Sequence, residues 1–137
     1  MMAQKALLFK DMEMYQEIMN EQYPAIQKSL GRKVKDFDSE KWNAIAKHVV
    51  YRANTAKFTQ NKNFFDALMA TGDTLLVEAS PEDTIWGIGL SENDPIALDE
   101  TQWLGTNWLG QIITDVRMDI LNEKEMWNIF LENPLLV

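Results

Sequence analysis

The sequence contains no cysteine and a single histidine, His48. The missing cysteines exclude a disulfide framework, thiolate metal sites and cysteine nucleophiles, and they fit a reducing, cytoplasmic compartment. A lone histidine cannot build a metal site, because metal ligands come in clusters, so we expect no metal and no cofactor. His48 lies in the middle of a helical stretch and is expected to be an ordinary surface or packing residue.

Long hydrophobic runs are also missing. No apolar stretch approaches the ~18 residues that a membrane span needs, and Lys5 and Lys10 interrupt the apolar N-terminus, so neither a span nor a signal peptide is expected. With 137 residues, of which 46% are hydrophobic and 25% charged, the composition is typical of one soluble domain.

Basic residues are scarce in the second half of the chain. Residues 1–62 hold eleven of the thirteen Lys and Arg residues against seven acids, whereas residues 63–137 hold two against fourteen. The net charge of −8 argues against tight direct DNA binding, because phosphate neutralisation needs clustered cations. The basic first half could hold a local phosphate, and the alternative is a solvated surface.

Apolar residues at helical spacing predict most of the secondary structure. The third helix is expected to follow a loop at residues 36–39, with Asp38 or Ser39 as its cap and Trp42 on its buried stripe. Gly72 is expected to end the fourth. The predicted helices cover residues 3–21, a short stretch from 24 to 31, about 39–53, 61–71, a stretch from about 109, and 123–132.

Two β-rich runs interrupt the helices. Residues 74–79 and 84–90 are predicted to be short strands, separated by a turn at residues 80–83. The expected fold class is therefore α+β, mainly α, a single domain with a small β element.

Several polar residues stand in unusual settings. Lys57 and Asn61 flank Phe58 in AKFTQN, Asp83 precedes Trp86 in DTIWGIG, and Asn107 lies between glycines in LGTNWLG. Each also has an ordinary interpretation. Asn61 or Asn107 can cap the helix that follows, Asp83 can be a turn residue, and Trp86 can belong to the core.

These motifs together resemble the NADAR, or YbiA-like, family. The resemblance rests on their order and spacing, covers residues 1–121, and leaves residues 122–137 as a helical C-terminal extension. The matching segments are MMAQKALLF at the start, LGRxV from Leu30, Trp42, KFxQN from Lys57, TGxxxLVEASPxDxIWGIGL from Thr71, GxNxLG from Gly105 and DVR from Asp115.

The resemblance implies an α+β fold around one pocket and N-glycosidase activity, in a bacterial or phage protein. Implied substrates are ADP-ribosylated guanine or nucleic acid, or phosphoribosylamino-pyrimidine intermediates of riboflavin synthesis. An alternative is a catalytically impaired module that binds ADP-ribose or a nucleotide. A further alternative, from charge alone, is an acidic interaction protein with a basic partner.

The resemblance also implies roles for individual residues. Asp83, in the family's DxxW spacing, would stabilise the oxocarbenium-like sugar or activate water, as carboxylates do in glycoside hydrolysis. Trp86 would offer a flat wall to a base, and Trp42 matches a second family tryptophan that can line a pocket from the core.

Phosphate contacts are expected from the basic half. Arg32 and Lys57 are predicted to hold a phosphate, and Asn61 belongs to the same substrate-binding motif as Lys57. Asn107, at the start of a helix, is predicted to add contacts near a helix N-terminus suited to anions. Arg117, in the last motif, is expected to lie beside the apolar stripe and to pair with an acid.

In relatives, the MMAQKALLF segment follows a motif with a glutamate that is expected to be catalytic. Because this segment begins at Met1 here, we expect that glutamate to be missing. The chain would then be a truncated active enzyme, a short form that binds without turnover, or a protein completed by another chain. The missing segment would expose apolar surface and favour self-association.

Overall fold

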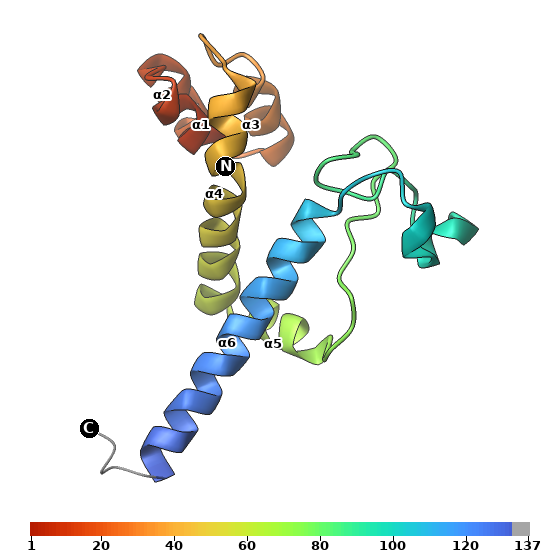
Figure 1. The fold of residues 1–137 in the computed structure, drawn as a ribbon. Helices are drawn as coiled ribbons and strands as arrows, with labels where there is room; N and C mark the ends of the chain where they lie inside the picture. The colour runs from red at the N-terminus through yellow and green to blue at the C-terminus, as the bar shows by residue number, and fades with distance from the viewer. Residues whose placement is uncertain (133–137) are drawn as a thin grey trace. The chain divides into compact units, whose positions relative to one another are not determined.

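The computed structural model describes the backbone of residues 1–132 and the side chains of residues 1–125. The chain divides into two compact units, Met1–Ala53 and Asn54–Val137, and each is described by itself (Figure 1). We call them the first unit and the second unit.

The first unit opens with three short helices that pack on one another. They are α1 (Met2–Leu8), α2 (Met12–Asn20) and α3 (Pro24–Gly31). Ala6, Ile18 and Val34 form their buried core. The single helix predicted over residues 3–21 is wrong, because the backbone turns at Lys10, whose φ is +58°, a left-handed conformation that no helix can continue through.

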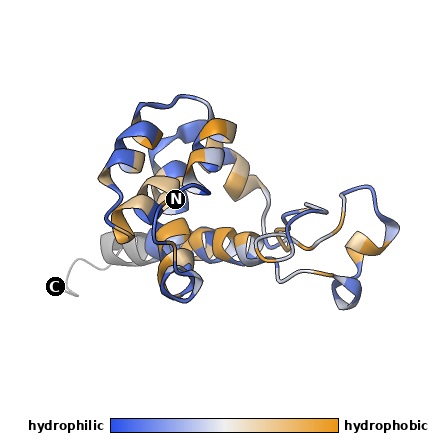
Figure 2. Cartoon of the chain, turned by 90° about the horizontal axis from the view of Figure 1, so that it is seen from above, coloured by the Kyte–Doolittle hydropathy of each residue, from blue (hydrophilic) through white to orange (hydrophobic). Residues whose placement is uncertain are grey.

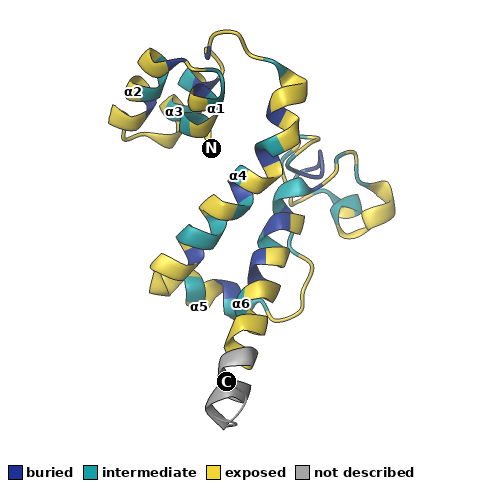
Figure 3. Ribbon diagram, turned by 60° about the vertical axis from the view of Figure 1, so that its left-hand side comes forward, coloured by how far each residue is buried: buried dark blue, intermediate teal, exposed yellow. Residues whose placement is uncertain are grey.

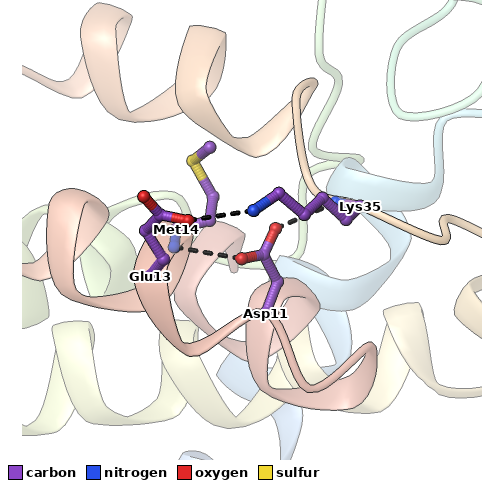
Figure 4. Close-up of polar contacts among 4 residues, drawn as sticks. All are labelled: Asp11, Glu13, Met14 and Lys35. Carbon is purple, nitrogen blue, oxygen red and sulfur yellow. Dashed lines mark hydrogen bonds and ion pairs between the residues drawn. The ribbon is translucent and has the colours of Figure 1, made fainter.

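A buried carboxylate fixes this break. Asp11 caps α2 by accepting a hydrogen bond from the Met14 N–H at 3.2 Å, and its other oxygen accepts from the Lys35 N–H at 2.9 Å (Figure 4). The Lys35 ammonium nitrogen also lies 2.9 Å from Oε2 of the Glu13 carboxylate. Asp11 therefore joins the start of α2 to the segment that follows α3.

The helix α4 (Ser39–Gln60) begins where the sequence predicts and ends later. Asp38 Oδ1 accepts from the Glu40 and Lys41 N–H groups at 3.0 and 3.1 Å, which confirms the predicted cap. The predicted end near residue 53 is wrong, because no glycine or proline interrupts the chain before Gln60. Trp42, Ala46 and Val50 are buried along one side (Figure 3).

The second unit has two further α-helices, α5 (Lys62–Ala70) and α6 (Trp108–Glu132), and two short 3₁₀ turns, η1 (Pro95–Leu98) and η2 (Glu100–Gln102). Gly72, at a φ of +58°, follows the end of α5 and confirms the predicted terminator. The two predicted helices after residue 108 are one continuous helix. The predicted apolar face of Met126, Trp127 and Phe130 lies outside the described side chains.

The two predicted strands are wrong. Residues 1–132 contain no strand, so the mainly α part of the predicted fold class holds and its small β element does not. The two runs do meet, through a hydrogen bond from the Ile88 N–H to the Glu78 carbonyl at 2.9 Å. No ladder extends from it, because the carbonyl groups of residues 84–88 are bonded to the segment that leads into α6.

Apolar residues lie on the helices and on the long loop of the second unit alike (Figure 2). Ile88 and Val116 are almost fully buried, whereas Leu98 is 95% exposed and Leu104 66% exposed. None of the helices, as far as the structure describes them, is long and apolar enough to cross a membrane.

The Asp11 junction predicts a pH-dependent contribution to stability. The Lys35 N–H bond, with the Met14 N–H bond and the Lys35 charge, lowers the pKa of Asp11 below its usual 3.8 against the opposing effect of desolvation. A carboxyl group whose pKa is lowered by folding stabilises the folded protein above pH 3.8. This contribution is lost as the pH falls through the pKa of the folded state. We expect Asp11→Asn to lower Tm by a few degrees at pH 7. The difference in Tm between the variant and the unmodified protein is expected to narrow below pH 3.8.

Thermal unfolding of both proteins from pH 7 to pH 2.5 measures the difference in Tm. Glu13→Gln, which removes an exposed ion pair, is the control and is expected to change Tm little. An Asp11→Asn deficit of equal size at every pH would contradict the charge-based account.

Candidate functional site

Asp83 organises a tight turn in the second unit. Its Oδ1 accepts hydrogen bonds from the Ile85 N–H at 3.1 Å and the Trp86 N–H at 2.7 Å. Asp83 is therefore a turn residue, as its ordinary interpretation held. Its side chain is half-buried, and its second oxygen makes no hydrogen bond within the described part of the chain. One oxygen shapes the loop and the other stays available.

The loop after Asp83 caps the N-terminus of α6. The Ile85, Trp86 and Gly87 carbonyls accept from the N–H groups of residues 108, 109 and 107 at 3.2, 3.0 and 3.1 Å. Helix termini leave such N–H groups without partners inside the helix, and here the loop supplies them. A side chain at Gly105 would collide with the Gly87 carbonyl, so the close approach requires glycine at that position.

Asn107 ties a third segment to this loop. Its side chain is 1% exposed; Oδ1 accepts from the Glu78 N–H at 3.0 Å, and Nδ2 donates to the Leu76 carbonyl at 2.9 Å. Its φ is +51°, a conformation that asparagine tolerates better than most residues. Side chain and neighbouring N–H groups are thus already bonded within the fold, and a ligand at this helix terminus would have to displace those bonds.

Trp86 is held at the same place. Its ring meets Trp108 edge to face, with centroids 5.6 Å apart and planes at 89°. Such pairs contribute about 1 kcal/mol beyond their buried area, so the ring orientation is fixed before any ligand binds. Trp86 remains half-buried.

Lys57 and Asn61 lie together at the end of α4. Asn61 Nδ2 donates to the Lys57 carbonyl at 2.8 Å, and the Lys57 ammonium lies 5.0 Å from the ring of Phe64 and 5.2 Å from that of Phe58. Both polar side chains are exposed. Within the described residues, no hydrogen bond or ion pair connects this pair to the Asp83 turn.

A pocket of about 290 Å³ opens in the second unit. Its lining is mostly apolar, and Glu78 is the one carboxylate that lines it among the described residues. Asp83 and Trp86 do not line it. The lining consists of Phe58, Ala67, Leu68, Thr71, Leu76, Val77, Glu78, Leu109, Gly110 and Ile113.

Sequence reasoning missed Glu78 as a candidate. A Cβ on Gly87 would lie 2.9 Å from the Asp83 carbonyl oxygen and 3.3 Å from Glu78 Cγ, so the two acidic residues approach Gly87 together. The available signal was the motif itself, because Glu78 stands five positions before Asp83 in VEASPED. Glu78 therefore lies near the Asp83 main chain, and its side chain lines the 290 Å³ pocket.

Arg117 is fully buried, and no acid pairs with it in the described part of the chain. It is 1% exposed; Nη1 donates to Thr71 Oγ1 and Nη2 to the Thr74 carbonyl, both at 2.7 Å, while Nε has no partner in the described part of the chain. The expected pairing with an acid is wrong. Because Thr71 lines the 290 Å³ pocket, the hydrogen bond from Arg117 helps to fix one wall of that pocket.

The two remaining predicted residues belong to the first unit. Arg32 is exposed and follows the C-terminus of α3, whereas Trp42 is 8% exposed in α4. Trp42 is therefore a core residue, as its helix stripe predicts. The other predicted residues, Lys57, Asn61, Asp83, Trp86 and Asn107, belong to the second unit.

We expect Asn107→Ala to lower the free energy of unfolding by about 2–4 kcal/mol, because it leaves the Glu78 N–H and the Leu76 carbonyl without partners. Chemical denaturation measures the loss. Asn93→Ala, at an exposed loop position, is the control. Unchanged stability with weakened ligand binding would instead assign Asn107 to substrate.

Arg117→Ala is expected to cost about 2–4 kcal/mol, because it opens a cavity and unpairs Thr71 and Thr74. The matched change Lys124→Ala removes an exposed cation from the same helix and is expected to be nearly neutral. Equal denaturation midpoints for both variants would show that Arg117 contributes little to the fold.

Comparison with known proteins places these observations among related sequences. The model of the NADAR domain matches residues 1–121. Protein irg-1 of Caenorhabditis elegans is 41% identical over 126 residues, covering 90% of this chain and 59% of the worm protein. N-glycosidase R617 of Acanthamoeba polyphaga mimivirus is 40% identical over 117 residues, covering 85% of this chain and 69% of the viral protein. The chloroplastic riboflavin biosynthesis protein PYRR of Zea mays is 32% identical over 80 residues, 58% of this chain and 11% of the maize protein.

Proposed function

Because this chain belongs to the NADAR family, we propose that it acts as an N-glycosidase, a hydrolase that cleaves the bond between a ribosyl carbon and a nitrogen. A relative 40% identical to it is named an N-glycosidase, which supports the reaction class. The chain spans 59% of the worm relative and 69% of the viral one, so the activity is proposed for this chain rather than transferred to it.

The observation that carries the proposal is the Asp83 turn. One carboxylate oxygen is held by two backbone N–H groups, so the side chain is fixed, and the other oxygen has no hydrogen bond within the described residues and can face a substrate. A fixed carboxylate stabilises positive charge in a transition state at little reorganisation cost. The half-buried Trp86 ring, three residues later, is held by Trp108 and supplies a flat surface.

The reaction requires positive charge to be stabilised at the sugar and a water to be activated. As the C–N bond breaks, its electron pair leaves with the nitrogen, and the sugar gains oxocarbenium character that the Asp83 carboxylate stabilises. Water then adds to the ribosyl carbon, and its proton passes to a carboxylate before it reaches the leaving nitrogen. Glu78, whose Cγ lies near Gly87 beside the Asp83 carbonyl oxygen, is the residue proposed to take that proton.

The proposed substrates are ADP-ribosylated guanine or nucleic acid, or phosphoribosylamino-pyrimidines. The second class is supported by a relative named as a riboflavin biosynthesis protein. Within the second unit, Trp86 is proposed to contact the base, Lys57 a phosphate, and Asn61 a further polar group of the substrate. Lys57 is exposed and held over two aromatic rings, which leaves its ammonium accessible to an anion.

A second candidate is an ADP-ribose or nucleotide-binding module without turnover. The observation that favours it is that neither Asp83 nor Trp86 lines the 290 Å³ pocket, which is mostly apolar. Saturable binding of ADP-ribose with no release of base from any of the proposed substrates would select this candidate.

Asp83→Asn tests the enzyme directly. Asparagine keeps the oxygen that accepts the Ile85 and Trp86 N–H bonds and removes the charge, so we expect Tm to stay within a few degrees. Turnover is expected to fall by roughly 10²–10⁴-fold. Release of base from ADP-ribosylated guanine and from a phosphoribosylamino-pyrimidine measures it.

The matched control is Glu82→Gln, which neutralises the adjacent exposed carboxylate. Both proteins should bind ADP-ribose alike. Full activity in Asp83→Asn would remove Asp83 from the mechanism, and an unfolded Asp83→Asn protein would make it a structural turn residue alone.

A further inference from the structure

The first unit contains a pocket that no step of the proposed reaction uses. It has a volume of about 440 Å³ and lies between the beginning of the chain and one face of α4. Ile45, His48, Val49, Arg52 and Ala53 recur at helical spacing, so α4 supplies a continuous stripe to it. Met1 and Gln4 complete the lining.

The lining combines an apolar wall with cationic and polar groups. Ile45 and Val49 are half-buried, and His48 and Arg52, one helical turn apart, are exposed on the same face. No carboxylate lines the pocket among the described residues. The absence of acids matters, because an adjacent carboxylate would repel an anion.

These polar side chains are not committed to the fold. Gln4, His48 and Arg52 make no side-chain hydrogen bond or ion pair within the described residues. In contrast, the cations Lys35, Lys41 and Lys62 of this basic half each meet a carboxylate. Arg52 and His48 thus offer hydrogen-bond donors beside an apolar surface, the combination that fits a phosphate attached to a sugar.

We propose that this pocket binds the phosphate of a ribosyl phosphate, with Arg52 and His48 holding the phosphate oxygens and Ile45 and Val49 contacting the sugar. The choice of a ribosyl phosphate rests on the proposed function, whereas the anion site rests on the pocket alone. Arg52 presents its planar fork to two oxygens, and His48 donates from a ring nitrogen.

His48 provides the probe, because it is the one histidine in the sequence and its Hε1 proton therefore gives one assignable NMR resonance. Titration of the full chain with ribose 5-phosphate at constant pH is expected to shift this resonance saturably. Free ribose is expected to leave it unmoved. Inorganic phosphate is expected to shift it with weaker affinity, because it lacks the sugar that would contact Ile45 and Val49.

Arg52→Gln is expected to raise the Kd for ribose 5-phosphate about tenfold, the effect of losing a charge-assisted hydrogen bond at an exposed site. The fold should be unaffected, because the Arg52 side chain has no hydrogen-bond or ion-pair partner among the described residues. Lys33→Gln removes another exposed cation of the first unit and should leave Kd unchanged. Calorimetry with His48→Gln, which lacks the probe, is expected to show a similar weakening.

A histidine resonance that does not move with ribose 5-phosphate, or that moves equally with free ribose, would overturn the proposal. So would an unchanged Kd in Arg52→Gln. Failure of the enzymatic proposal is distinct, since a saturable phosphate response in a protein with no turnover leaves the anion site standing. Turnover in a protein whose His48 resonance does not respond to ribose 5-phosphate would leave the enzyme standing and refute this site.

Discussion

The fit of one loop against the N-terminus of α6 sets the structure of the second unit. The carbonyls of residues 85–87 satisfy N–H groups that a helix cannot bond internally, and Asn107 extends the connection to residues 76–78. Gly105 permits the close approach of the loop to residues 105–107, and the turn at Asp83 orients the loop carbonyls toward the helix. Asp83 and Trp86 are therefore fixed by main-chain bonding before any substrate is present. A change to the hydrogen bonds between residues 85–87 and the N-terminus of α6 would move both.

Local signals in the sequence predicted much of this fold. The Asp38 cap and the stop at Gly72 depend on neighbours within a few residues, so they could be predicted correctly. The conformation of residues 84–90, where a strand was predicted, could not be predicted in this way. The β-rich composition of this segment gives a real preference for extended backbone, but pairing is decided by where the carbonyls find donors, and those donors come from residues 104–109. The break at Lys10 likewise depends on Lys35, far along the chain, bonding to Asp11.

The same distinction applies to the candidate site. The link between Asp83 and Trp86 spans three residues and is visible as DxxW, whereas Asn107 bonds residues 29 and 31 positions away and Arg117 reaches Thr71 across 46. Glu78 was overlooked although it stands five positions before Asp83 in the motif, because its approach to the Asp83 main chain at Gly87 appears only in three dimensions. His48 was interpreted as an ordinary helix residue for a similar reason, since its pocket needs Met1 and Gln4 as the opposite wall.

Arg117 shows how a buried charge is tolerated in this unit with no paired acid among the residues whose side chains are described. Thr71, which Arg117 contacts, is the C-cap of α5, and its hydroxyl donates onward to the Leu68 carbonyl at 2.6 Å. The guanidinium thus lies at the negative end of a helix dipole, and residues 63–137 add fourteen acids to two basic residues. These fields offset part of the desolvation cost that a lone buried cation would bear. In return, the planar fork joins α6 to the end of α5 and to Thr74, which holds one wall of the pocket that Glu78 lines. A neutral side chain could fill the space, but it could not bond both acceptors at once, so charge and pocket geometry are linked through one residue.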